Sequence, residues 1–278
     1  MENVKLLCEK YGLHPQRQAG QNFLIDKNIL NKIIQVAELK KDDVILEIGA
    51  GFGVLTRELA GRVKKVIAVE LDKRLVVALK EELKNFKNIV LINKDILKIQ
   101  NLELKIINNK YKIVANVPYN ITSAILRKFL SEELIRPSEM ILLIQKEVAE
   151  RIIAKPGQMS LLSISVQFYS QPKIISVVSK NSFWPAPKVN SAIIKLNLNK
   201  QFNIEIEKDF FDLVRAGFSS RRKQLKNNLK KIKIRSKKTM EKIFEELNFN
   251  PMIRAQELSV KDWVELYKKI HYTLKAKS

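Results

Sequence analysis

The stretch Asp43-Val44-Ile45-Leu46-Glu47-Ile48-Gly49-Ala50-Gly51-Phe52-Gly53 joins a short apolar run to three glycines at alternate positions. The apolar run suits a parallel strand that is covered on both faces. Apolar residues at helical spacing from Val54 to Leu59 follow the glycines directly. The stretch therefore predicts the first strand, turn and helix of a nucleotide-binding sheet, because glycine lets the backbone turn tightly and a ligand approach closely.

The spacing of the glycines distinguishes between ligands. A dinucleotide-binding loop has the pattern G-x-G-x-x-G, whereas here G-x-G-x-G follows an acid, Glu47. This pattern resembles motif I of the class I methyltransferases, which use S-adenosylmethionine. The alternative is a glycine turn that only packs a helix against a strand, and the segments that follow must decide between the two.

Two acids follow the next predicted strands. Glu70 ends the apolar run from Lys65, about 20 residues beyond the loop, where sheets of this kind hold a ribose by its hydroxyl groups. Asp95 follows a third run, Ile89 to Ile92, and an acid there suits an adenine amino group. Either acid has a plainer alternative, Glu70 as an exposed acid at a helix start and Asp95 as a helix cap.

The fourth predicted strand, Lys112 to Ala115, delivers Asn116-Val117-Pro118-Tyr119. Proline fixes its own backbone and keeps the residue before it out of the helical region, so this tetrapeptide forms a stiff turn. The side-chain carbonyl of Asn116 and the neighbouring main-chain carbonyls can accept both hydrogens of an exocyclic amine. Tyr119 offers a flat surface to a base. The alternative is a proline turn with a buried tyrosine.

A second proline-rich segment runs from Phe183 to Ser191 and includes Trp184, Pro185 and Pro187. It separates two predicted antiparallel strands, from Lys173 to Val178 and from Ser191 to Leu196. Its aromatic residues form a second stacking surface for a base, or they cover an edge of the sheet.

Composition narrows the class of function. The 278 residues carry 51 Lys and Arg against 29 Asp and Glu, a net charge of +22, which favours a polyanionic partner. A single cysteine and two distant histidines give no metal-binding pattern and no disulfide framework. The sequence has neither a long apolar span nor a secretory signal, so we expect a cytoplasmic protein with no membrane partner.

The predicted domains are 1–200, which holds the strands, and 201–278, which is helical. We expect helices from Lys208 to Phe218, from Ser219 to Ile232, from Lys238 to Leu247 and from Ser259 to Leu274. The segment from Arg215 to Lys238 carries eleven Lys and Arg and no acid, which favours a phosphate-binding surface over a merely solvated face.

Taken in order, these segments resemble the KsgA family of small-subunit ribosomal RNA adenine dimethyltransferases. The resemblance covers nearly the whole chain. Beside the motifs above, it rests on Gln21-Asn22-Phe23-Leu24, on Phe218-Ser219-Ser220-Arg221-Arg222-Lys223-Gln224-Leu225 and on Arg254-Ala255-Gln256-Glu257-Leu258-Ser259. It implies an α/β fold, with a Rossmann-like class I methyltransferase domain and a smaller C-terminal all-helical domain.

The resemblance also implies roles for single residues. The S-adenosylmethionine site would be lined by Asn22, Leu24, Gly49, Gly51, Glu70, Asp95 and Asn116. Asn116 and the carbonyl of Pro118 would hold the target amine, while Tyr119 and Phe183 would sandwich a flipped base. The RNA would be bound by Arg221, Arg222, Lys223 and Lys226. The implied substrate is a pair of adjacent adenosines in the 3′-terminal hairpin of the RNA of an immature small ribosomal subunit, modified by a monomer.

Three positions depart from the family pattern. Val117 replaces a common leucine, Lys94 stands where a glycine often precedes Asp95, and Ala19 replaces a larger apolar residue. None of them alters an implied donor, acceptor or stacking ring, although Lys94 could change the rim of the cofactor pocket.

Three other readings compete with this one. A sister family methylates a large-subunit RNA adenine and confers macrolide resistance, but the segment from Phe218 to Leu225 and the basic helical tail favour the small-subunit reading. A ribosome-assembly or transcription factor that keeps only the fold is disfavoured because the site residues are intact. A nicotinamide enzyme is disfavoured by the glycine spacing.

Overall fold

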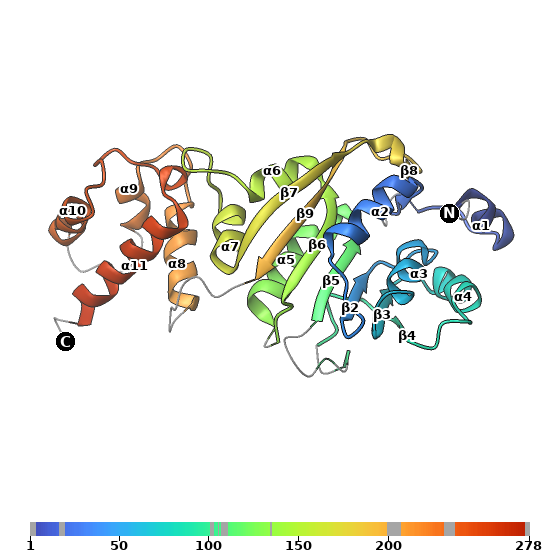
Figure 1. Cartoon of the computed structure of the whole chain (residues 1–278). Helices are drawn as coiled ribbons and strands as arrows, with labels where there is room; N and C mark the ends of the chain where they lie inside the picture. The colour runs from blue at the N-terminus through green and yellow to red at the C-terminus, as the bar shows by residue number, and fades with distance from the viewer. Residues whose placement is uncertain are drawn as a thin grey trace. The chain divides into compact units, whose positions relative to one another are not determined.

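The computed structural model describes residues 4–16, 20–100, 103–104, 106, 111–133, 135–198, 207–230 and 237–275 (Figure 1). The contacts between residues divide the chain into two compact units. The first comprises Met1–Glu150 and Gln171–Asn199, and the second comprises Arg151–Ser170 and Lys200–Ser278.

This division differs from a single boundary at residue 200, because the segment 151–170 belongs to the helical unit. Its helix α7 (Leu161–Tyr169) ends in two aromatic residues that pack on α8 (Glu207–Gly217). The ring of Phe168 stacks on that of Phe210 with centroids 4.7 Å apart, and the hydroxyl of Tyr169 donates to Glu207 at 2.8 Å. A boundary drawn from composition misses these contacts because they join segments far apart in sequence.

The first unit is built on a seven-stranded sheet of order β4-β3-β2-β5-β6-β9-β7. The strands β2 to β6 pair in parallel, and β9 pairs antiparallel with β6. The bounds are β2 Val44–Ile48, β3 Lys65–Glu70, β4 Ile89–Asn93, β5 Tyr111–Asn116, β6 Glu139–Gln145, β7 Ser170–Val178 and β9 Ser191–Leu198. The chain leaves β2 toward β3 on one side, and β5 adjoins β2 on the other. Ligands bind at such a switch point, outside the carboxyl ends of the strands.

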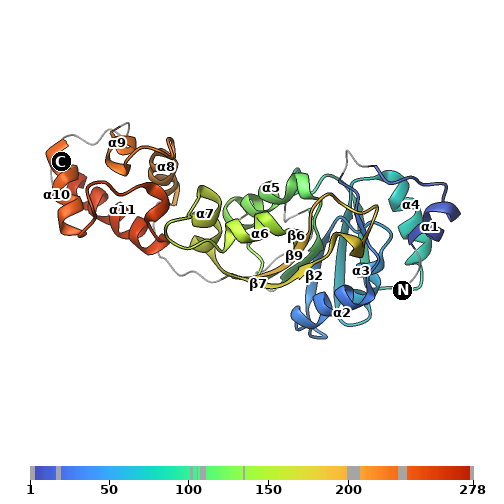
Figure 2. The same ribbon diagram turned by 90° about the horizontal axis from the view of Figure 1, so that it is seen from above.

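Helices cover both faces of this sheet, with α5 and α6 on the face opposite to α2 and α3 (Figure 2). The helices of the first unit are α1 Val4–Lys10, α2 Lys27–Val36, α3 Val54–Ala60, α4 Lys73–Glu82, α5 Thr122–Arg127, which continues as a π-helical turn over Lys128–Glu132, and α6 Lys146–Ile152. Asp26 caps α2, because its side chain accepts from the main-chain nitrogens of Asn28 and Ile29.

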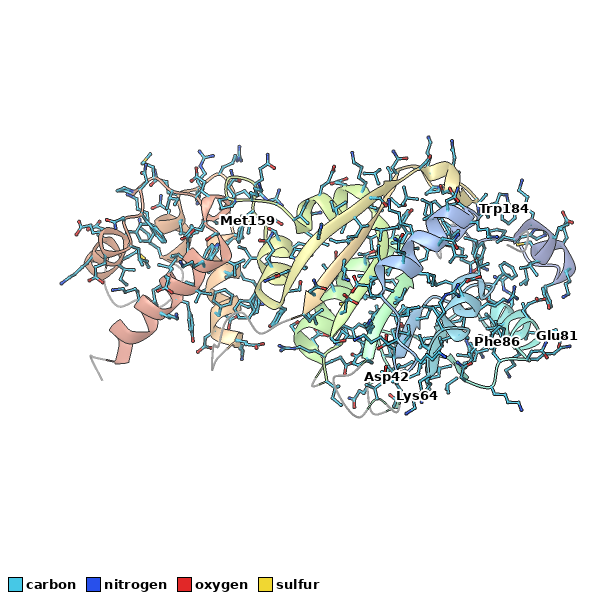
Figure 3. The ribbon with its side chains drawn as sticks, in the orientation of Figure 1. Asp42, Lys64, Glu81, Phe86, Met159 and Trp184 are labelled. Atoms are coloured by element: carbon cyan, nitrogen blue, oxygen red, sulfur yellow. The ribbon has the colours of Figure 1, made fainter. Side chains whose placement is uncertain are left out.

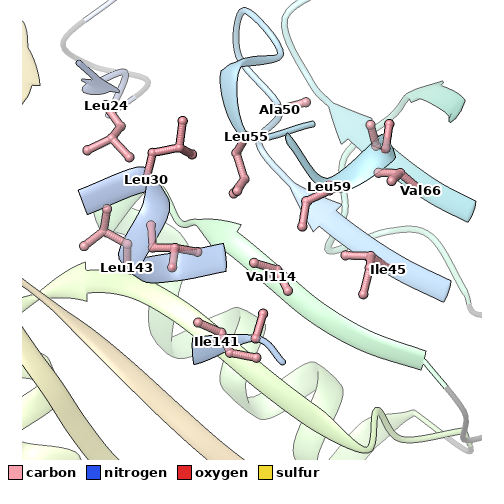
Figure 4. Close-up of a cluster of buried hydrophobic side chains, with 14 of the residues drawn as sticks. Leu24, Leu30, Ile45, Ala50, Leu55, Leu59, Val66, Val114, Ile141 and Leu143 are labelled. Atoms are coloured by element: carbon pink, nitrogen blue, oxygen red, sulfur yellow. The ribbon is translucent and has the colours of Figure 1, made fainter. Parts of the chain in front are cut away.

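The main core lies between α2, α3 and the sheet. Buried side chains such as Leu30, Leu59, Val114 and Ile141 belong to one apolar cluster there (Figure 4). The strands are apolar on both faces because helices cover both, which is why their sequence reads as continuous apolar runs.

A second, two-stranded sheet ties the N-terminal segment to the proline-rich loop. In it β1 (Phe23–Leu24) pairs antiparallel with β8 (Phe183–Trp184). Trp184 is half-buried and packs against the cluster that contains Val4 and Phe52 (Figure 3). The aromatic residues of this loop therefore join two segments that are distant in sequence.

The second unit is helical, as the sequence predicts, and contains α7, α8, α9 (Leu225–Leu229), α10 (Lys237–Glu246) and α11 (Val260–Lys275). The predicted helix from Ser219 to Ile232 is wrong in its extent. The amide of Asn228 donates to the carbonyls of Gly217 and Ser220, at 2.6 and 2.9 Å, and so holds the preceding residues in a turn. Within the described ranges, no helix is both long enough and apolar enough to cross a membrane.

Candidate active site

The glycine loop after β2 requires its glycines. Gly49, Gly51 and Gly53 have φ angles of 75°, 61° and 78°, in the left-handed region that side chains disfavour. A Cβ on Gly51 would lie 3.2 Å from the ring of Phe23, and one on Gly49 would lie 3.4 Å from Cδ of Pro118. The loop is therefore packed between the N-terminal segment and the Asn116–Tyr119 turn.

Glu70 lies at the carboxyl end of β3 and is buried. Its Oε2 accepts from the main-chain nitrogen of Gly51 at 2.9 Å, and its Oε1 accepts from that of Asp72 at 2.9 Å. Burial raises the pKa of Glu70, while the N–H groups of Asp72 and Gly51 oppose that rise. This geometry excludes an exposed acid at a helix start, and the carboxylate, with about four lone-pair sites, retains capacity for a further donor.

Glu47 is more deeply buried, within β2. Its Oε2 and the Oγ1 of Thr56 have no hydrogen-bond partner among the described residues. Burial raises the pKa of Glu47 to about 8; the nearby hydroxyl of Thr56 opposes the rise, and the charge of Glu70 adds to it. At neutral pH Glu47 is therefore mostly protonated under the glycine loop.

The Asn116–Tyr119 turn is held on three sides. The Nδ2 of Asn116 donates to the carbonyl of Asn22 at 3.1 Å, and the main-chain nitrogen of Val117 donates to Leu143 at 3.1 Å. The hydroxyl of Tyr119 is 2.6 Å from the hydroxyl of Ser191. The amide of Asn116 is thereby oriented with its donor engaged and its carbonyl Oδ1 left to accept.

The carbonyl of Pro118 is already occupied. It accepts from the main-chain nitrogen of Ile121 at 3.2 Å and from the hydroxyl of Thr122 at 3.4 Å. Since a carbonyl has two lone pairs, a target amine would have to displace one of these donors. The carbonyl of Val117 accepts no hydrogen bond from any residue within the described ranges.

These residues surround one cavity of about 510 Å³ at the carboxyl ends of β2, β3 and β5. Eight of the residues predicted for cofactor or target line it: Asn22, Gly49, Gly51, Glu70, Asp95, Asn116, Pro118 and Tyr119. The size is that of a small-molecule site. Other residues also line the cavity although the sequence motifs predicted no role for them, among them Phe23, Arg74, Ile96 and Asn120. In the sequence, these residues could have been predicted only from their position, because each lies within a few residues of one with a predicted role.

Leu24 and Phe183 do not line this cavity. Both are buried in the main core cluster, and they pair with each other across β1 and β8. In this conformation the ring of Phe183 supports the N-terminal segment beside Asn22 and is not open to a base.

Asp95 caps a turn through one carboxylate oxygen and exposes the other. Its Oδ1 accepts from the main-chain nitrogen of Leu97 at 3.0 Å, which caps a turn, although no helix follows. Its side chain also lines the cavity and is 30% exposed, with Oδ2 at 4.0 Å from the Nζ of Lys98. Oδ2 is therefore accessible to a ligand. Lys94, which replaces the common glycine, also lines the cavity, and its Nζ pairs with Glu103.

The cavity fits S-adenosylmethionine by its chemistry. The buried carboxylate of Glu70 and the accessible one of Asp95 can accept from ribose hydroxyls and an adenine amine, respectively. Gly49 and Gly51 also line the cavity, so the main chain of the glycine loop can lie against a ligand. Among the residues that the structure describes, no group of three or more metal-binding side chains occurs.

The predicted RNA-binding residues belong to the second unit. Arg221, Arg222 and Lys223 are exposed on the turn before α9, and Lys226 is half-buried at its start. Further basic residues of the same run lie outside the described residues, namely Lys231, Lys233 and Arg235.

Known proteins resemble this chain over nearly its whole length. The sequence model of a family described as ribosomal RNA adenine dimethylase matches residues 13–271. The chain is 44% identical to ribosomal RNA small subunit methyltransferase A of Dehalococcoides mccartyi, over 96% of this chain and 92% of that one. It is 43% identical to the protein of the same name from Clostridium botulinum, over 95% of this chain and 97% of that one.

Two solved structures share the fold. A dimethyladenosine transferase from Plasmodium falciparum superposes with a TM-score of 0.78 at 27% identity, over 90% of this chain and 98% of that one. The 23S rRNA methyltransferase ErmE superposes with a TM-score of 0.73 at 26% identity, over 90% of this chain and all of the other.

Proposed function

Because the chain belongs to the ribosomal RNA adenine dimethylase family, we propose that it dimethylates the exocyclic amino groups of two adjacent adenosines in the 3′-terminal hairpin of small-subunit ribosomal RNA. The methyl donor is S-adenosylmethionine. The observation that carries the proposal is the oriented amide of Asn116 at the edge of a cavity that has the acids a nucleoside cofactor needs.

The cofactor would be held by residues at the carboxyl ends of three strands. Glu70 would accept from the ribose hydroxyls and Asp95 from the adenine amine, while the main chain at Gly49 and Gly51 would lie against the ligand. When bound, the cofactor supplies an electrophilic methyl group. The protonated state of Glu47 would keep a second charge away from Glu70.

The target amine would be held by two uncharged acceptors. Oδ1 of Asn116 is the first, because Nδ2 is engaged by Asn22. We place the second at the carbonyl of Val117 instead of that of Pro118, whose lone pairs are taken by Ile121 and Thr122. Hydrogen bonds to two acceptors direct the nitrogen lone pair toward the methyl group, and most of the rate enhancement would come from this positioning.

The target base must leave its stack to reach this point, because the amino nitrogen is otherwise inaccessible. Tyr119 would supply one face of the base site. A strong base is unnecessary, since the proton can leave the nitrogen after it has become positively charged. Phe183 could supply the second face only if the loop that carries it moved from its position in the core.

The small-subunit substrate is favoured by the names of the relatives that are 43 to 44% identical over nearly their whole lengths. ErmE, a large-subunit enzyme, is 26% identical. The exposed basic turn at Arg221–Lys223 would bind phosphates of the RNA. We further propose that the protein acts as a monomer in the cytoplasm, on immature small subunits.

The experiment that tests the choice of substrate offers labelled S-adenosylmethionine with unmodified small-subunit particles and, separately, with large-subunit RNA. Label on the small-subunit RNA alone supports the proposal. Label on the large-subunit RNA would favour the macrolide-resistance activity, and no label on either would favour a binding factor that keeps only the fold.

A further inference from the structure

The hydroxyl of Tyr119 makes its hydrogen bond to a residue that lies outside the Asn116–Tyr119 motif. Its partner at 2.6 Å is the hydroxyl of Ser191, which is fully buried at the start of β9. Among the described residues, the hydroxyl of Ser191 makes its hydrogen bond to Tyr119. Each hydroxyl would lose its partner if the other were removed.

Ser191 is fixed by the sheet. It pairs with Gln145 at the end of β6, and β6 pairs in turn with β5, where Asn116 lies opposite Leu143. The main-chain nitrogen of Val117 also donates to Leu143. Ser191 and Asn116 therefore belong to one hydrogen-bonded framework at the carboxyl ends of β5 and β6.

We propose that Ser191 is a positioning residue for methyl transfer, which acts by anchoring the ring of Tyr119 beside the target base. The hydroxyl lies on the long axis of the tyrosine ring, so the bond to Ser191 sets where the ring lies, and packing sets its tilt. This inference rests on the proposed role of Tyr119 in stacking.

The surroundings of Tyr119 favour anchoring over proton transfer. Burial raises the pKa of Tyr119, although the bond to Ser191 opposes the rise, so the phenol stays neutral at physiological pH. A neutral phenol that is bonded to a serine can neither take up the proton of the amine nor move freely. Tyr119 is half-buried and lines the cavity, so part of its side chain can contact the base.

The test is a double-mutant cycle with Ser191→Ala, Tyr119→Phe and the double variant, measured with labelled S-adenosylmethionine and unmodified small-subunit particles. Each single variant should lower kcat roughly tenfold, which is the scale of one lost positioning contact. The KM for RNA and the cofactor affinity should change less than threefold. The double variant should be no slower than the slower single variant, because both changes remove the same bond.

The matched control is Ser170→Ala. Ser170 is as buried as Ser191 and donates to the carbonyl of Val166 at 2.8 Å, but it lies in the other unit. It should lose stability without losing kcat. Ser191→Thr, which keeps a hydroxyl, should recover part of the activity.

Normal turnover by Ser191→Ala or Tyr119→Phe, or an additive double variant, overturns the inference while the proposed function stands. Tyr119→Phe alone decides the matter if Ser191→Ala does not fold. A wild-type chain that transfers no label overturns the proposed function and this inference with it.

Discussion

The amide nitrogen of Asn116 donates to the main-chain carbonyl of Asn22 at 3.1 Å, across 94 residues of sequence. The bond decides which end of the amide faces the cavity, because the nitrogen is engaged and the oxygen remains to accept. It also makes the N-terminal segment a part of the active site. That segment is held in turn by the pairing of Phe23 and Leu24 with Trp184 and Phe183.

Asn116→Ala should lower methyl transfer roughly 100-fold or more, because the amine loses the acceptor that positions it. RNA binding should persist. Transfer from labelled S-adenosylmethionine and filter binding of RNA measure the two effects. Asn88→Ala is the control, since the Asn88 amide donates to the carbonyls of Ala60 and Val63 at the other end of the sheet. Near-normal turnover by Asn116→Ala would remove Asn116 from the mechanism.

Thr122→Val distinguishes the two candidate main-chain acceptors. It frees one lone pair of the Pro118 carbonyl while it keeps the shape of a buried side chain. If Val117 supplies the acceptor, kcat should change less than about twofold, because the contact to the amine is untouched. A clear rise in kcat or in RNA affinity, measured under saturating cofactor, would instead return the role to Pro118.

Gly51→Ala should destabilise the fold by about 1 to 2 kcal/mol through its left-handed backbone, and it should also weaken cofactor binding, because the new Cβ presses on Phe23. Gly12→Ala is a matched control, since Gly12 has the same φ of 61° with nothing within 4 Å. Calorimetric titration and urea unfolding separate the two effects. Equal cofactor affinity in the two variants would contradict the packing argument.

Glu47→Gln should change how stability depends on pH. The folded state holds the proton of Glu47 up to about pH 8, whereas the unfolded chain releases it near 4.5. Because the folded pKa is raised, the contribution of Glu47 to wild-type stability is fully present below pH 4.5 and is lost as the pH rises to about 8, by at most about 1.4 kcal/mol per pH unit. Urea unfolding at several pH values should give the variant a flatter curve over this window. An identical slope in both proteins would mean that Glu47 does not hold the proton.

Reversing Arg221, Arg222 and Lys223 to glutamate should weaken RNA binding and flatten its dependence on salt. Loss of three phosphate contacts lowers the slope of log affinity against log salt by about 2 to 3. The control variant changes Lys40, Lys41 and Lys64 to glutamate. These side chains are exposed on the first unit, so the net charge of the protein changes by the same amount. Figure 3 marks Lys64 at the edge of the sheet that holds the amino ends of the strands. A slope equal to that of this control would exclude the basic turn from phosphate contact.

The sequence predicted those features that depend on neighbouring residues. The strand from Val44, the glycine turn and the stiff turn after Asn116 all follow from local pattern, and the structure contains each of them. The position of Glu70 at the end of a strand was also predicted, because an acid that ends an apolar run lies at the crevice of a parallel sheet.

The missed features depend on contacts between distant segments. The bond between Asn116 and Asn22 and the pairing of β1 with β8 have no local signature. The helix expected from Ser219 is shorter because Asn228 folds back on Gly217 and Ser220, which periodicity cannot reveal. Phe183, an expected stacking residue, is buried in the core. The sequence could not predict this, because an aromatic side chain suits a core and a base-stacking surface equally well.

The proposed dimethylation is tested most directly by mass spectrometry of the 3′-terminal fragment of small-subunit RNA, after reaction with the wild-type chain and S-adenosylmethionine. We predict four added methyl groups, two on each of two adjacent adenosines, and, in an equally short reaction with Asn116→Ala, about one hundredth of that methylation or less. If the wild-type chain leaves this fragment unmodified, or transfers its methyl groups to other nucleotides, the proposed function is contradicted.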